Sequence, residues 1–310
     1  MEGSRNVTQI VSTFIIIGFP SSRSLQILFF FLFLFMYILT TIENLLVITI
    51  IWKSRNLHKP MYFFLGNLSF LEAWYVTVTV PKLLCIFISD NKQITFTACM
   101  TQLFFFLFLG CTEGVLLTVM AFGRYVAICN PLHYVTKMNW HFCFVLAVCT
   151  WITGFVIAII KIYFISQLTF CHSNLINHFY CDVSPILNLA CTDMKQTEVV
   201  DFVLALIILL VPLLLTCLSY LCILITIFRI PHSSGRKKAF STCGSHLVVV
   251  IILYSTTLFM YARPSRAQSI NSNKLVSVVY TVVTPFLNPI IYCLRNKEVK
   301  AAVYKLLSTN

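Results

Sequence analysis

Three acidic residues, Glu43, Glu72 and Glu113, lie in long apolar stretches of this sequence. An ionisable side chain in such a stretch is costly to bury and is therefore a candidate functional group. With Asn288, these acids could form a polar cluster that holds a cation or carries protons, or they could form hydrogen bonds that only fix helix packing. An enzyme needs a nucleophile and a base within reach of each other, and no His stands beside these acids in the sequence.

The sequence also lacks a glycine-rich phosphate loop, and its His and Cys residues do not recur at metal-ligand spacing in any segment expected to face the cytoplasm. We therefore expect no enzymatic activity, no cofactor and no metal centre.

The elements that must position the acidic residues are membrane-spanning helices. Of the 310 residues, 59% are hydrophobic and 10% are charged, whereas soluble globular chains average about 25% charged residues. A water-facing protein of this size could not hide its 28 Phe side chains, because its surface would have to be largely hydrocarbon. The composition excludes a soluble enzyme, a disordered chain and a nucleic-acid-binding module.

Seven apolar stretches are long enough to cross a bilayer, which requires roughly 20 residues for a core of about 30 Å. The expected spans are residues 25–52, 60–87, 98–128, 141–164, 198–228, 239–261 and 274–294. We therefore predict an all-α membrane protein, a seven-transmembrane-helix bundle (25–294) with an extracellular tail (1–24) and a cytoplasmic tail (295–310). Val299, Val303 and Leu306 lie on one helical stripe of the cytoplasmic tail and predict a short amphipathic helix on the membrane surface.

Basic residues in the connecting segments predict the orientation of the bundle. One side collects thirteen Lys and Arg against one acid, and the other collects nine against six acids. Because Lys and Arg concentrate in cytoplasmic loops, the first side faces the cytoplasm and the N-terminus lies outside the cell. The triplet Asn6-Val7-Thr8 in the N-terminal tail is an acceptor sequence for N-glycosylation, which agrees with this orientation.

Four of the 13 cysteines lie in the expected exterior regions or at their rim: Cys99, Cys171, Cys181 and Cys191. Exterior cysteines can form disulfides, and four of them allow three pairings. A disulfide from the long segment 165–197 to Cys99 would hold that segment as a lid over the bundle. Cys171 and Cys181 could instead bind zinc together with His172 and His178, but disulfides explain exterior cysteines better.

Four motifs, in this order along the chain, resemble those of odorant receptors in the rhodopsin-like G-protein-coupled receptor superfamily. They are Pro60-Met61-Tyr62-Phe63-Phe64-Leu65, the run from Met120 to Tyr134 (MAFGRYVAICNPLHY), the run from Lys238 to Leu247 (KAFSTCGSHL), and the run from Pro285 to Tyr292 (PFLNPIIY). The resemblance covers essentially the whole chain. It implies a plasma-membrane receptor of olfactory neuron cilia that binds a small odorant from outside. It also implies activation of a stimulatory, olfactory-type heterotrimeric G protein that raises cAMP.

The resemblance further implies the disulfides Cys99–Cys181 and Cys171–Cys191. It places the ligand in the outer half of the bundle, against Phe106, Leu107, Gly110, Cys111, Leu204, Ile208, Tyr254, Thr257, Leu258, Tyr261 and Val278. The run from Leu103 to Leu109 contains no acid that could pair with a buried ammonium. We therefore expect a neutral, lipophilic ligand.

By the same resemblance, the residues that couple the bundle to the G protein are Arg124, Tyr125, Tyr220, Asn288, Pro289 and Tyr292. The chain departs from the family pattern at Gly123, where an Asp usually precedes the Arg, and at Glu72, where the family generally has Asp. Loss of the local ion pair, and a glycine inside a helix, lead to the hypothesis of a looser inactive state with raised basal signalling or poorer surface expression.

An alternative interpretation is a seven-span transporter or ion carrier that uses Glu43, Glu72 and Glu113 as a relay. Inverted repeats would support it, and the two halves of the sequence show none. Odorant-dependent signalling through a G protein would distinguish the receptor from a carrier, which would move substrate without one.

Overall fold

The computed structural model describes residues 12–89, 92–171, 173–192, 194–229, 233–261, 270–295 and 297–308. Within these ranges, seven helical segments are long and apolar enough to cross a membrane, which confirms the predicted seven-helix fold. Six of them are continuous helices: α1 (Arg23–Lys53), α2 (Pro60–Ile88), α3 (Phe96–Cys129), α5 (Trp140–Ser166), α7 (Lys195–Arg229) and α8 (Ser233–Tyr261). The seventh comprises α9 (Ile270–Val278), the turn η3 (Val279–Val283) and α10 (Thr284–Arg295).

Residues at the helix starts explain several of these boundaries. Thr95 caps α3 by accepting a hydrogen bond from the Ala98 backbone N–H (3.3 Å), and Asn139 caps α5 by accepting one from Phe142 (2.9 Å). Pro60 occupies the first turn of α2, where its missing N–H costs nothing. Helix α8 begins at Ser233, several residues before the expected start of that span at 239, because its first turns extend beyond the apolar stretch.

The seventh span is not a uniform helix. Its middle segment, η3, is a π-helical turn that directly precedes the Thr284-Pro285 pair. Proline has no N–H to donate to a carbonyl one turn earlier, so the helix must adjust locally. The Val279 carbonyl oxygen accepts hydrogen bonds from both the backbone N–H and the hydroxyl (2.9 Å) of Thr284, which hold the π-helical turn.

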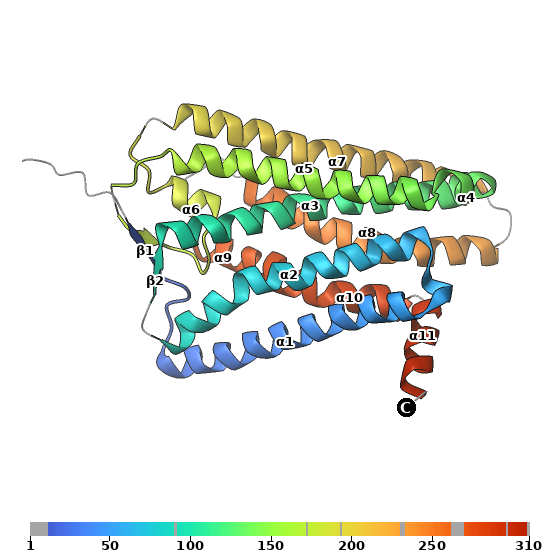
Figure 1. Ribbon diagram of the computed structural model, residues 1–310, viewed down its shortest axis with the longest axis horizontal. Coiled ribbons are helices and arrows are strands. Elements are labelled where there is room, and N and C mark those ends of the chain that lie inside the picture. Colours follow the sequence, from blue (N-terminus) through green and yellow to red (C-terminus); the bar gives the residue numbers. More distant parts are fainter. Residues whose placement is uncertain are drawn as a thin grey trace, which may run out of the picture.

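Helix α3 lies at the centre of the bundle and contacts α2, α5, α7 and α8 (Figure 1). In the most apolar window of α3, 67% of the residues are buried, against 11% for α1 and for α7, whose remaining surfaces face outward. Apolar outer faces are expected for helices surrounded by lipid. Helix α3, which contains Arg124, is therefore packed against other helices on most of its surface.

One end of the bundle carries a small sheet that the sequence did not predict. Its central strand β1 (Thr13–Ile16) pairs antiparallel with β2 (Gln93–Thr95) and parallel with β3 (Leu175–Ile176). We call this sheet and residues 167–194, which include the short helix α6 (Val183–Leu187), the lid, and we call this end of the bundle the lid end (Figure 1). Residues from the N-terminal segment thus form part of the lid.

The opposite end, here called the Arg124 end, carries the turn η2 (Pro131–His133), the short helix α4 (Tyr134–Lys137) and the C-terminal helix α11 (Lys297–Ser308). Helix α11 runs across the bundle axis (Figure 1). Its Glu298 carboxylate accepts hydrogen bonds from Lys59 Nζ (2.8 Å) and the Tyr62 hydroxyl (2.9 Å), which attach it to the start of α2. Val299 of the predicted apolar stripe is buried against the bundle.

A candidate ligand cavity and the polar residues beneath it

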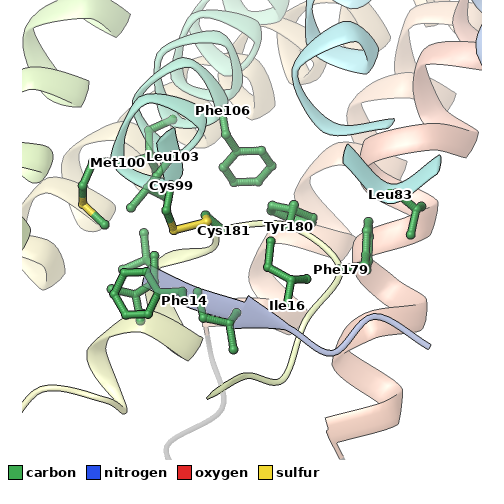
Figure 2. Close-up of a cluster of buried hydrophobic side chains, with 14 of the residues drawn as sticks. Phe14, Ile16, Leu83, Cys99, Met100, Leu103, Phe106, Phe179, Tyr180 and Cys181 are labelled. Carbon is green, nitrogen blue, oxygen red and sulfur yellow. A yellow bond between two sulfur atoms is a disulfide. The ribbon is translucent and has the colours of Figure 1, made fainter. Parts of the chain in front are cut away.

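Two disulfides hold the lid in place. Cys99, at the start of α3, is bonded to Cys181 (Figure 2), and Cys171 is bonded to Cys191. This is the pairing that the family resemblance implied. Because Cys171 and Cys181 are both in disulfides, neither can serve as a thiolate ligand for zinc, and His172 lies outside the described residues.

The lid has its own hydrophobic core around the first disulfide. Phe14 and Ile16 of β1 are fully buried, and the Phe14 ring meets the edge of Phe170 with centroids 5.6 Å apart. Figure 2 shows β1 on one side of the Cys99–Cys181 bond and Phe106 of α3 on the other. Tyr180 packs on Phe106, with ring centroids 4.7 Å apart. The N-terminal strand β1 therefore packs within the lid, on the side of this disulfide away from Phe106.

Two polar contacts attach the lid end to the seventh span. His178 Nε2 lies 3.2 Å from the Ser277 hydroxyl, and Lys274 Nζ donates a hydrogen bond to the Gly18 carbonyl oxygen (2.7 Å). Burial, together with the nearby Lys274 ammonium, lowers the pKa of His178 to about 3. The imidazole is therefore neutral at physiological pH.

A cavity of about 340 Å³ lies beneath the lid and is enclosed by α3, α7, α8 and the seventh span. Its wall combines aromatic and aliphatic side chains with a few hydroxyls and one thiol, which is typical of small-molecule sites. Seven of the predicted ligand residues line it: Phe106, Leu107, Gly110, Cys111, Ile208, Tyr254 and Thr257.

The other four predicted ligand residues do not line this cavity in the described part of the chain. Leu204, Leu258 and Val278 are absent from its wall, and the side chain of Tyr261 lies outside the described residues. Leu258 points away although its neighbour Thr257, also predicted, lines the cavity, and Ser277 lines it instead of Val278. The reason is geometric, because successive residues of an α-helix point about 100° apart.

Sequence reasoning missed three acidic residues that line the cavity: Asp182, Glu198 and Asp201. Asp201 of α7 is paired with Lys161 of α5 (Nζ to Oδ1, 2.7 Å), and the Lys161 side chain is 2% exposed. The charge count assigned Lys161 and Asp201 to exterior segments, whereas the structure places them within two membrane-spanning helices. A charged residue inside an apolar span was the signal that could have found this pair.

Asp182 lies in the lid, where its carboxylate accepts a hydrogen bond from the Val183 backbone N–H (2.7 Å). Burial raises the pKa of the Asp182 carboxyl to about 6, and the negative charge of Asp201 acts in the same direction. The hydrogen bond from Val183 and the positive charge of Lys161 oppose the shift. The carboxyl therefore titrates close to physiological pH.

Below the cavity, the structure brings together two members of the predicted polar cluster. Asn288 Nδ2 donates a short hydrogen bond to Glu72, both residues are buried, and Glu113 is near enough to interact with Glu72 electrostatically. Glu43 forms no hydrogen bond with these residues in the described part of the chain. Glu72 and Asn288 therefore connect α2 to α10, as the packing interpretation requires.

A second polar network links three helices near Arg124. The ring of His246 in α8 lies between the Tyr220 hydroxyl of α7 (2.7 Å from Nδ1) and the Leu117 carbonyl oxygen of α3 (3.0 Å from Nε2). Because a carbonyl only accepts, Nε2 carries the proton, and Nδ1 of a neutral ring accepts from Tyr220. Sequence reasoning did not single out His246, although it lies in one of the four motifs.

Arg124 itself is 6% exposed, and it influences Tyr220 and Tyr292 electrostatically. Tyr292 is buried, and its hydroxyl has no hydrogen-bond partner among the described residues. Tyr125 packs beside these residues in the same cluster as Tyr220. The two ends of the seven-helix bundle thus differ, with a mainly apolar cavity under a lid at one and a buried arginine at the other.

Comparisons with known proteins agree with this arrangement. The family model described as "Olfactory receptor" matches residues 33–310. Olfactory receptor 6B1 of Homo sapiens is 60% identical over 296 residues, which cover 96% of this chain and 94% of the relative. Olfactory receptor 6B9 of Mus musculus is 54% identical over 303 residues (98% and 96%). The chain belongs to the olfactory receptor family.

Membership of this family defines the class of function. The receptor is a multi-pass membrane protein and not an enzyme, its ligand is an odorant, and its intracellular partner is a G protein. The carrier interpretation of Glu43, Glu72 and Glu113 is not needed to explain a receptor. The predicted glycosylation site, Asn6, lies outside the described residues.

The departure at Gly123 lies next to Arg124 on α3. A Cβ atom at Gly123 would lie 3.4 Å from Met138 Cε and 3.9 Å from Met61 Cε, both at the ends of flexible side chains. The site therefore accepts a Cβ atom, and a larger side chain would displace the ends of these two flexible methionines.

Proposed function

We propose that the receptor binds a small, neutral, lipophilic odorant in the cavity beneath the lid and then activates a stimulatory, olfactory-type G protein that raises cAMP. The observation that carries this proposal is the enclosed cavity, whose wall includes seven predicted ligand residues. Its apolar wall supports a lipophilic ligand. Of its three acids, Asp201 is paired with Lys161, the Asp182 carboxylate accepts a hydrogen bond from the Val183 backbone N–H, and Glu198 lies on an exposed first turn of α7.

We also propose that the lid end faces outward and the Arg124 end faces the cytoplasm. Lys53, Arg55, Lys137 and Arg229 are all exposed at the Arg124 end, as expected for a cytoplasmic surface. In this orientation the receptor resides in the plasma membrane, by family resemblance in the cilia of olfactory neurons, with Asn6 outside and available for glycosylation.

Two helices run from the cavity to the Arg124 end and can transmit the signal. Helix α3 carries Phe106 and Gly110 at the cavity and Arg124 further along, and α8 carries Tyr254 at the cavity and His246 two turns away. A ligand shifts such a bundle only by binding one packing better than another. We propose that the odorant favours a packing in which the Tyr220–His246–Leu117 network rearranges and Arg124 reaches the G protein.

The decisive experiment fills the cavity from Gly114. This glycine lines the cavity, and a Cβ atom built there meets no heavy atom within 4 Å. Gly114→Leu should therefore abolish the odorant-evoked cAMP signal without lowering surface expression, since leucine also favours the helix. Val211→Leu adds bulk on the outward face of α7, where Val211 is half exposed, and is the matched control.

The measurement is cAMP in cells that express an equal surface density of each variant, over a panel of odorants, with and without the stimulatory G protein. Full odorant response in Gly114→Leu would place the ligand elsewhere. A response that persists without the stimulatory G protein would show that another G protein couples to the receptor.

A further inference from the structure

A second hollow opens on the outside of the bundle at the Arg124 end, between α1, α2 and the start of α5. This groove has a volume of about 520 Å³ and shares no lining residue with the ligand cavity. Its floor and sides are apolar: Ile48, Ile51, Phe63, Gly66, Phe70 and Trp140. Because these three helices cross the membrane, the groove opens toward lipid rather than toward water.

The groove exists because Gly66 lacks a side chain. A Cβ atom built on Gly66 would have Ile51 Cδ1 as its nearest neighbour, at 3.8 Å. The missing side chain therefore leaves space over the α2 backbone between larger residues. The T-shaped pair Phe63–Trp140, with centroids 5.9 Å apart, forms one wall. The space is therefore open and not filled by neighbouring side chains.

The polar side chains of the wall already have partners. The Asn67 amide oxygen accepts a hydrogen bond from Trp151 Nε1 (3.1 Å), and its Nδ2 donates to the Phe63 carbonyl oxygen (2.9 Å). The Tyr62 hydroxyl donates to Glu298 (2.9 Å). With these groups satisfied, the inner groove presents hydrocarbon and favours an apolar occupant such as an acyl chain.

The mouth of the groove has the opposite character. Trp52 and Trp140 are 78% and 53% exposed, and exposed tryptophans concentrate at membrane–water interfaces. His58 lines the groove and is exposed, as are Lys53 and Arg55, which lie beside the lining residues along the chain. The nearby acid Glu298 is already bound by Lys59 (2.8 Å). Lys53 and Arg55 are not themselves lining residues, but they place two exposed cations in the short segment between the lining residues Trp52 and Leu57.

From this combination we propose that the groove binds an anionic glycerophospholipid, with one acyl chain between α1, α2 and α5 and its headgroup phosphate at Lys53 and Arg55. Basic residues close to an anionic leaflet each attract such lipids. A sterol would fill the apolar part but would leave both cations without a partner. The lipid would brace the start of α2, which also attaches α11, and the proposal does not depend on which odorant binds.

The test uses the purified full-length receptor in nanodiscs that contain phosphatidylserine, phosphatidylcholine and cholesterol, and measures retained lipids by native mass spectrometry. The wild type should retain phosphatidylserine in preference to phosphatidylcholine. Lys53→Gln with Arg55→Gln should reduce that preference by roughly fivefold for each charge removed, while phosphatidylcholine is retained as before. Gly66→Leu, which fills the groove, should release both lipids, and Val211→Leu should release neither.

Equal retention of the two phospholipids by the wild type, or preferential retention of cholesterol, would overturn the proposal. Unchanged retention in Gly66→Leu would do the same. If Gly66→Leu does not fold, the variant at Lys53 and Arg55 still decides the outcome, because both side chains are exposed and their replacement does not disturb the bundle.

Discussion

The ion pair between Lys161 and Asp201 offers a sharp test of how this bundle holds charge inside the membrane. Its two members differ in exposure, since the Lys161 side chain is 2% exposed and the Asp201 side chain 20%. At their separation of 2.7 Å, the attraction amounts to about 6 kcal/mol at an effective dielectric constant of about 20. Much of that attraction is offset by the cost of removing both charges from water.

Removing one partner should cost more than the pair contributes, because it leaves the other charge buried. A single substitution of this kind typically costs about 3–5 kcal/mol. Asp201→Asn leaves the fully enclosed ammonium of Lys161 and should fall at the upper end of that range. Lys161→Met leaves a carboxylate that water can still reach through the cavity, and it should fall at the lower end. The double variant should be close to the wild type.

The assay is the thermal midpoint of the purified receptor in detergent, measured for the wild type, both single variants and the double variant. Surface expression of the same four proteins in cells provides an independent ranking. A double variant that is as unstable as the sum of the two single variants would refute the reasoning. So would a larger loss for Lys161→Met than for Asp201→Asn.

Three further predictions concern single positions. The pKa of Asp182 is raised from 3.8 to about 6, so between these values the folded protein binds a proton that the unfolded chain has lost. Its stability should therefore fall as pH rises from about 4 to 6. In Asp182→Asn, the thermal midpoint measured as a function of pH should lose this decline. Gly154→Ala should prevent folding, because its Cβ would overlap Thr112 Oγ1 and lie 2.8 Å from the Phe108 carbonyl oxygen, whereas Gly66→Ala, with 3.8 Å of clearance, should keep the wild-type midpoint. Gly123→Asp should lower ligand-free cAMP per surface receptor by supplying a carboxylate beside Arg124, and an unchanged basal signal would contradict the hypothesis of a loosened inactive state.

The seven helices could be predicted because composition and stretch length decide which segments lipid accepts. The expected start of α2 coincides with the observed one, and the other ends of α2 and α3 differ by one or two residues, since apolar runs bounded by charged or capping residues define them. The family motifs singled out Arg124, Asn288 and Tyr292; the structure places Tyr292 within electrostatic reach of Arg124 and pairs Asn288 with Glu72, and their coupling role stays a prediction. In each case the information is local, and the chain carries it in consecutive residues.

Sequence reasoning was less successful where distant segments meet. It identified the four cysteines of the lid end but left three pairings open, and only the family resemblance selected one. It did not predict β1, because Thr13–Ile16 has no partner nearby in the chain: its hydrogen bonds go to Gln93–Thr95 and Leu175–Ile176. Strand formation there depends on the lid being present.

The amino-acid sequence by itself therefore determined the membrane class, the number of spans and the motif residues, because the hydrophobicity of a continuous stretch and the identity of a motif do not depend on packing. The tertiary structure alone decided which face of each helix borders the cavity, so that Leu258 is absent from its wall and Ser277 lines it instead of Val278. It also decided that Lys161 is buried against Asp201 and that His246 joins three helices. These outcomes depend on helix rotation and on contacts between segments far apart in the chain, which arise only when the helices pack together.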